Sequence, residues 1–244
     1  MILDVSWWVW LLMGLALAVG ALVQGTVGLG LGLVAAPVLT LLAPDLMPGL
    51  ILFLTLLLPV ITLAEGRSAA DVRGLLWALP PRIPGTVLGA WLVVQLDQGT
   101  LGLAIGAMVL LAVVASAVAL PLPLRRETLV VAGFVSGITG TVSSIGGPPL
   151  ALLYQRQPLD VIRQTLAVYF VAGALLSLGA LGVGGELSWG QLALAGLLAP
   201  FVVGGFLLAP LLRRRVPPHR VRPAVLVVCG FSAVVLLVRS LLTW

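Results

Sequence analysis

The stretch Gly137–Pro149, which reads GITGTVSSIGGPP, decides the fold together with Gln24–Gly32, which reads QGTVGLGLG. Each stretch connects two apolar segments, yet neither contains a charged residue. Uncharged backbone rich in Gly, Ser and Thr is tolerated at membrane depth where it is buried in protein or lines a wet cavity. The sequence therefore predicts two hairpins whose tips stop inside a membrane. Tight helix crossings, in which small residues let backbones approach, are the alternative.

The rest of the chain has the composition of a membrane protein. Of its 244 residues, 61% are apolar and 9% are charged, and the mean hydropathy is +1.22. A soluble domain has roughly 45–50% apolar and about 25% charged residues. Apolar runs such as Leu101–Leu120 are continuous and helical in length, whereas β-barrel strands alternate between apolar and polar residues. The predicted class is an all-α polytopic membrane protein.

Breaks at charged residues, Gly and Pro divide the chain into ten helical segments. Their predicted ranges are 7–23, 29–42, 47–64, 74–95, 100–120, 128–142, 147–155, 161–183, 189–212 and 223–241. Eleven of the thirteen arginines fall in four connections, those after the third, fifth, seventh and ninth segments, and the chain has no lysine. The positive-inside rule places these connections in the cytoplasm. Both termini are then predicted to lie outside.

The segments read as two copies of a five-segment unit, residues 1–120 and 121–244. Because five is an odd number, the arginine alternation predicts that the second copy lies inverted. Inverted repeats with discontinuous helices are typical of secondary transporters, which bind substrate at the repeat interface. The hairpins match at a spacing of 112 residues, and two later segments, expected to be interrupted by proline, match at 120. The matched pairs are Gly25 and Gly137, Gly28 and Gly140, Pro37 and Pro149, Pro80 and Pro200, and Gly85 and Gly205.

Composition also excludes several chemistries. One cysteine and one histidine cannot form a disulfide framework, a zinc site or a haem pair. All eight acids fall at segment ends or in loops, so no buried carboxylate is available for hydrolysis. We therefore expect no enzyme, no catalytic residue, no metal and no cofactor. The expected partners are a small anionic substrate and membrane lipid, and not nucleic acid. Whether the protein forms a homo-oligomer stays open.

The two tips and one arginine are the candidate substrate site. Free N–H groups at half-helix N-termini, together with side-chain donors, suit a small oxyanion. Arg82 is the one arginine that lies away from a predicted surface. Inside a membrane, a guanidinium is retained mostly if it faces a cavity or a partner. Alternatively, the Arg82 side chain extends to the lipid headgroups. Arg163, near a cytoplasmic helix start, steers substrate or anchors the helix. The candidate residues are Gln24, Gly25, Gly28, Gly30, Arg82, Thr139, Gly140, Thr141, Ser143, Ser144, Gly146, Gly147, Arg163 and Gln164.

The hairpin motifs resemble those of a known family. Ala21–Pro37, ALVQGTVGLGLGLVAAP, resembles the Gly-rich signature of the TauE/SafE sulfite exporter family. Gly133–Pro149, GFVSGITGTVSSIGGPP, resembles its second-half partner. The first copy departs from the pattern at Leu31, where the family usually has glycine. The resemblance covers essentially the whole chain and implies a transporter of sulfite, organosulfonates or related small anions in the bacterial cytoplasmic (inner) membrane.

We expect export rather than uptake. Expelling a monovalent anion from a cell that is negative inside is favoured by about 2.3 kcal/mol per 100 mV. With no acid at membrane depth, the expected driving force is the membrane potential, or a proton that the anion itself carries. An anion channel and a non-transporting membrane subunit of a transport or enzyme complex are the alternative functions.

Overall fold

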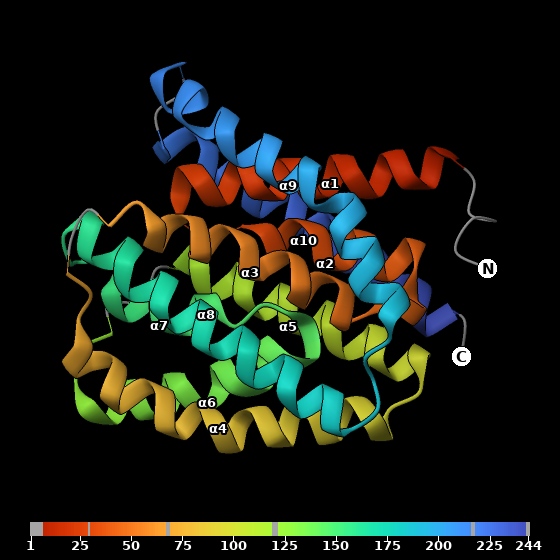
Figure 1. The fold of residues 1–244 in the computed structure, drawn as a ribbon, viewed down its shortest axis with the longest axis horizontal. Helices are drawn as coiled ribbons and strands as arrows, with labels where there is room; N and C mark the ends of the chain where they lie inside the picture. The colour runs from red at the N-terminus through yellow and green to blue at the C-terminus, as the bar shows by residue number, and fades with distance from the viewer. Residues whose placement is uncertain (1–6, 29, 67–68, 119–121, 216–217, 243–244) are drawn as a thin grey trace.

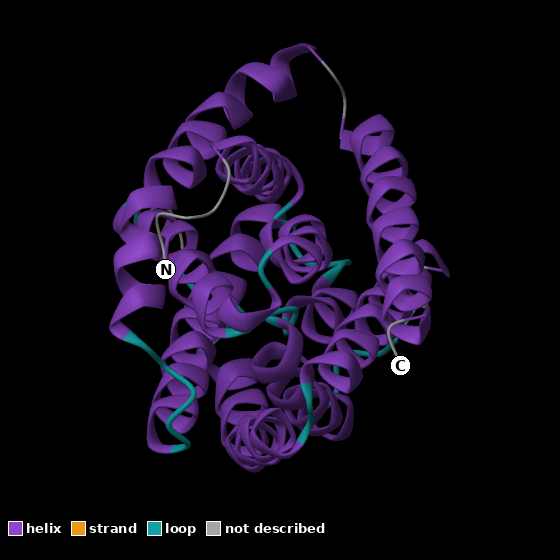
Figure 2. Ribbon diagram, turned by 90° about the vertical axis from the view of Figure 1, so that its right-hand side faces the viewer, coloured by secondary structure: helices purple, strands orange, loops and turns teal. Residues whose placement is uncertain are grey.

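The computed structural model describes residues 7–28, 30–66, 69–118, 122–215 and 218–242. This part of the chain is helical throughout and holds no strand, as Figures 1 and 2 show. The ten predicted segments are confirmed as helices, with ends that move by a few residues. The elements are α1 (Trp7–Val27), α2 (Leu31–Leu42), the 3-10 turn η1 (Pro44–Leu46), α3 (Gly49–Ala64), α4 (Val72–Gln95), α5 (Gln98–Val118), α6 (Arg126–Ser143), α7 (Gly147–Tyr154), α8 (Leu159–Val183), α9 (Trp189–Arg215) and α10 (Pro218–Leu242).

Among the described residues, five helices are long and apolar enough to cross a membrane. They contain the spans Trp7–Thr26, Gln98–Val118, Leu159–Val183, Trp189–Leu212 and Val225–Leu242. In contrast, α2 has 12 residues and α7 has 8, fewer than the roughly 20 that a spanning helix needs. Each short helix follows a longer one directly, so α1–α2 and α6–α7 form two helical hairpins. That their tips stop within the membrane stays a prediction.

The connections that carry arginine and those that do not lie at opposite ends of the helices. Helices α3, α5, α7 and α9 end, and α4, α6, α8 and α10 begin, toward the left of Figure 1. These are the connections that carry arginine, so we call this side the arginine-rich end. The first turn of α1 and the last turn of α10 lie at the opposite end. The alternation read from the arginines matches this arrangement of helices.

The prolines in α4 do not interrupt it, contrary to the expectation from the sequence. Pro80, Pro81 and Pro84 lie inside one continuous helix, Val72–Gln95. Helix α9 likewise continues through Pro200. Each proline removes one backbone donor, which favours a break in an isolated helix. Here α4 is packed against both α6 and α8 along its length, and this packing keeps the helix whole.

Two pairs of helices touch through their backbones: α4 with α6, and α1 with α9. A Cβ atom added to Gly85 of α4 would lie 2.2 Å from the carbonyl oxygen of Phe134 in α6. One added to Gly205 of α9 would lie 2.1 Å from the carbonyl oxygen of Ala18 in α1. Glycine is therefore the only residue that fits either crossing without moving the helices apart.

The two hairpin tips match at a spacing of 116 residues, one helical turn beyond the spacing of 112 that the glycine and proline matches predict. Gly28 and Ser144, 116 positions apart, have φ angles of 90° and 59°. Gly30 and Gly146, at the same spacing, precede the first residues of α2 and α7. Gly85 and Gly205, which are 120 positions apart, both lie against the backbone of a neighbouring helix. The inverted relation of the two halves stays a prediction.

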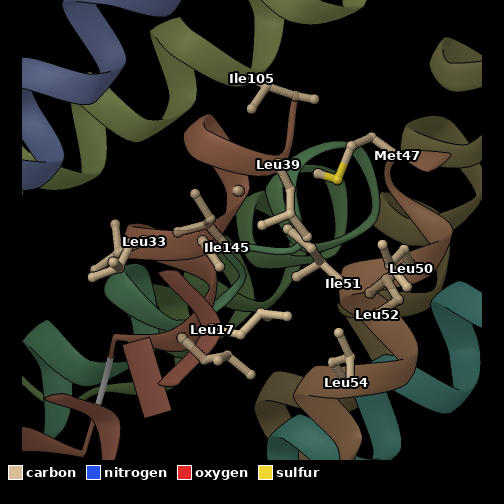
Figure 3. Close-up of a cluster of buried hydrophobic side chains, with 14 of the residues drawn as sticks. Leu17, Leu33, Leu39, Met47, Leu50, Ile51, Leu52, Leu54, Ile105 and Ile145 are labelled. Atoms are coloured by element: carbon tan, nitrogen blue, oxygen red, sulfur yellow. The ribbon is translucent and has the colours of Figure 1, made fainter. Parts of the chain in front are cut away.

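Buried apolar side chains hold α2 and α3 beside the second tip. Leu17, Leu39, Ile51 and Ile105, from four different helices, belong to one cluster and are fully buried. Figure 3 shows Ile145 of the α6–α7 tip among them. In a membrane such a core is stabilised by close van der Waals packing rather than by exclusion of water. The packing fixes the position of the tip relative to α3.

Candidate functional site

A cavity lies where the two hairpin tips meet α3, α4 and α8. The cavity has a volume of about 60 Å³, which is several times the roughly 15 Å³ that one water molecule needs. The tips themselves touch, because a Cβ on Gly32 would lie 2.6 Å from the carbonyl oxygen of Ser144. The lining residues are Gln24, Gly30, Gly32, Leu33, Leu52, Thr55, Arg82, Gly140, Ser144, Ile145, Gly146, Gly147, Pro148, Phe170 and Ala174.

Arg82 is the one charged side chain among these lining residues. It is only 3% exposed, so it is enclosed rather than extended to the headgroups. Its Nη1 donates to Ser136 Oγ at 3.2 Å, and its Cζ lies 4.4 Å from the ring centre of Tyr169. Its Nε has no hydrogen-bond partner, and no carboxylate among the described residues pairs with it. A buried guanidinium in this state is costly unless an anion completes it.

The guanidinium rests flat against α8 in a seat made by glycine. A Cβ on Gly173 would lie 1.9 Å from Arg82 Cζ, and one on Gly140 would lie 3.0 Å from Nη2. Ser136 connects this seat to the second tip, since its hydroxyl accepts from Arg82 and donates to the carbonyl of Gly146. The position of the arginine is thereby coupled to the start of α7.

The helix starts offer fewer free N–H groups than their glycines suggest. The first amide of α2, on Leu31, already donates to Gln24 Oε1 at 3.0 Å. Helix α7 begins with Gly147 followed by two prolines, which have no N–H. The amides of Gly146 and Gly147 therefore remain as the main backbone donors of the second tip.

The hydroxyl groups predicted as donors divide into two sets. Ser144 lines the cavity and donates to the carbonyl of Pro48 at 3.4 Å. Thr139, Thr141 and Ser143 do not line it; each donates to the carbonyl four residues earlier in α6, at 3.1, 2.8 and 2.7 Å. Hydroxyls in helices commonly satisfy the backbone in this way. Gly25 also lies away from the cavity, packed against Ala209 of α9.

A smaller hollow extends the cavity toward the arginine-rich end. Its volume open to water centres is about 30 Å³, and Gln24 and Phe170 line both spaces. Gly28 and Arg163 line only this hollow. Gln164 lines neither space; its Nε2 donates at 3.2 Å to the carbonyl of Thr62, a residue that borders the hollow. Arg163 thus lies on the approach to the cavity rather than inside it.

At the opposite end, the start of α3 packs closely against α9. A Cβ on Gly49 would lie 2.6 Å from Gln191 Oε1 of α9. The Nε2 of the same glutamine donates to the carbonyl of Leu46 at 3.4 Å. Together with the contact between Ser144 and Pro48, these interactions close α3 against α9 and the second tip.

Sequence reasoning missed the residues that position Arg82. Ser136 precedes the chargeless stretch by one residue, and Tyr169 was not among the candidate residues. Tyr169 and Gly173 are one turn apart on α8, and only the packing of α8 against α4 brings both to Arg82. Thr55 was missed because nothing in the sequence separates it from other threonines of apolar helices.

A Gly173→Ala variant tests the seat. The added methyl group displaces the guanidinium without removing its charge, so we expect affinity for a small oxyanion to fall about tenfold or more. Gly179→Ala on the same helix is the matched control, because an added Cβ there meets nothing within 4 Å. Calorimetric titration with methanesulfonate measures both; equal affinities would refute the role of Gly173.

Comparison with known proteins identifies the family of this chain. The family profile described as "Sulfite exporter TauE/SafE" matches residues 12–236, nearly the whole length. No curated protein matches the chain. No solved structure matches it either. From the profile match, the chain belongs to the TauE/SafE sulfite exporter family.

Proposed function

We propose that this protein is a secondary transporter that exports sulfite or a small organosulfonate across the bacterial cytoplasmic membrane. The substrate is held between the two hairpin tips and Arg82. The family consists of membrane transporters of sulfur anions and not of enzymes, and the five long apolar helices agree with a multi-pass membrane protein. The particular anion, the direction and the site residues are the proposal.

The buried Arg82 is the single observation that carries this function. Its charge has no partner among the described carboxylates, its Nε has no acceptor, and it lines the cavity between the tips. An anion in the cavity would supply both the missing charge and the missing acceptor. Sulfonate and sulfite oxygens are acceptors of the kind that guanidinium groups bind well.

The shape of the cavity supports binding from the cytoplasmic side, which is the first step of export. Its side hollow points to the arginine-rich end, which the positive-inside rule places in the cytoplasm, and Arg163 lies along that approach. A positive side chain there attracts anions from the cytoplasm. The tight packing of Gly49 against Gln191 at the other end supports a state that receives its substrate from inside.

Counterflow in proteoliposomes tests the transporter function. Vesicles loaded with unlabelled sulfite should transiently concentrate radiolabelled sulfite above its outside level, because a carrier exchanges one anion for another. An imposed potential that is negative inside should speed efflux, since each anion carries a charge out. A channel would instead give continuous current without counterflow. Absence of both flux and exchange for sulfite and for sulfonates would refute the proposal.

A further inference from the structure

We propose that the cavity selects singly charged anions: bisulfite and monosulfonates rather than sulfite dianion, sulfate or other dianions. This inference rests on the proposed transport function and adds the charge state of the substrate to it. It follows from the count of charges around the cavity and from the donors that are already occupied.

The cavity has one full positive charge. Arg82 supplies it, and the other lining residues are apolar or neutral. The position that corresponds to Arg82 in the second half, 120 residues later, is Val202 in α9, which is fully buried. The pseudo-equivalent helices therefore contribute one guanidinium and not a pair. Arg163 does not line the cavity; it lines the neighbouring hollow, which shares Gln24 and Phe170 with the cavity.

The partial charges of the two helix starts do not replace a second cation. They reside mainly on unsatisfied N–H groups of the first turn. Gln24 already accepts from the first amide of α2, at Leu31. In α7 the second and third residues are Pro148 and Pro149, which have no N–H to offer. Each tip keeps neutral donors for orienting an anion, but their field is weaker than that of two uncapped helices.

The surroundings make the balance of charge matter. Leu33, Leu52, Ile145, Phe170 and Ala174 give the wall its apolar side chains, and five further lining residues are glycines. In such an apolar setting a buried charge must be paired to be tolerated. One negative charge neutralises Arg82, whereas a dianion would leave one charge buried without a partner. We expect dianions to bind about tenfold or more weakly for this reason.

For sulfur oxyanions this charge rule becomes a rule about pH. Bisulfite loses its proton near neutral pH and becomes a dianion, while methanesulfonate stays singly charged throughout that range. Sulfite transport would then carry one proton and one net negative charge outward per cycle. No carboxylate in the protein is needed, since the proton travels on the sulfur anion itself.

The test compares methanesulfonate with sulfate, which differ in charge but have nearly the same size. Purified full-length protein is titrated with each anion, and with sulfite, from mildly acidic to mildly alkaline pH. We expect methanesulfonate affinity to stay constant, sulfate to bind about tenfold or more weakly, and apparent sulfite affinity to fall as pH rises in proportion to the bisulfite fraction. Sulfate binding equal to methanesulfonate, or sulfite affinity that rises with pH, would overturn the inference.

Two variants separate charge from hydrogen bonding. Ser136→Ala removes a partner of Arg82 but no charge, so it should weaken methanesulfonate and sulfate by the same factor. Thr55→Lys adds a second cation to the cavity wall and should shift the preference toward sulfate by about tenfold. If Thr55→Lys does not fold, the wild-type series decides alone. If no anion binds to folded wild-type protein, the proposed function itself fails, which differs from a reversed preference.

Discussion

An Arg82→Gln variant is expected to lose binding of methanesulfonate and sulfite by a factor of about one hundred or more, because a buried anion without its cation loses about 3–5 kcal/mol. The same substitution should leave the empty protein at least as stable as the parent. In the empty protein, the Arg82 guanidinium is buried without a carboxylate partner, so its removal relieves a cost of burying charge. Loss of binding together with a maintained or raised melting temperature is the expected signature.

Arg73→Gln is the matched control for Arg82→Gln. It makes the same change of side chain and charge on the same helix, α4, but at an exposed position outside the cavity. We expect its affinity for anions to stay within about twofold of the parent. Titration calorimetry and thermal unfolding in one detergent measure both properties. An Arg82→Gln protein that binds like the parent would remove the central residue of the site.

A Gly85→Ala substitution is expected to destabilise the protein by about 1–3 kcal/mol or more, through overpacking. The new methyl group would lie 2.2 Å from the carbonyl oxygen of Phe134, so α4 and α6 must separate. Gly205→Ala should act in the same way on α9 and α1, where the corresponding distance to Ala18 is 2.1 Å. Gly85→Ala should also reduce transport, because α4 carries Arg82 and α6 carries its partner Ser136.

Gly196→Ala makes the same chemical change, but it should not lower the stability of the protein. It lies within α9, and an added Cβ there meets nothing within 4 Å. Alanine is the better helix former by about 0.5–1 kcal/mol, so this variant should be neutral or slightly more stable. Thermal unfolding of the three alanine variants measures the difference. If Gly85→Ala were as stable as Gly196→Ala, the backbone contact between α4 and α6 would not exist as described.

The sequence was sufficient to predict the helices and to single out Arg82, which lines the cavity. Continuous apolar runs set the ten helices, and the missing charges of the two stretches indicated the hairpins. Arg82 stood out because a guanidinium far from a surface needs a reason to be retained. Each of these inferences depends on composition over several residues, which a single sequence contains.

The details that depend on contacts between distant segments were not predictable in this way. The register of the two tips is set by the residues with positive φ, Gly28 and Ser144, and serine gives no sign of this in the sequence. The hydroxyls of Thr139 and Ser143 bond to their own helix, although the same residues could equally have faced a ligand. Gly173 gains its role only because α8 packs against Arg82.

The backbone contacts also bear on how the chain is made. Helix α1 has its main partner in α9, and α4 has its own in α6, so each half of the protein depends on the other for a neighbour. During synthesis, α1 enters the bilayer long before α9 leaves the ribosome, and its glycine-lined flank faces lipid or the insertion machinery throughout that interval. Severing the gene between the halves should therefore yield two fragments that are stable only when produced together.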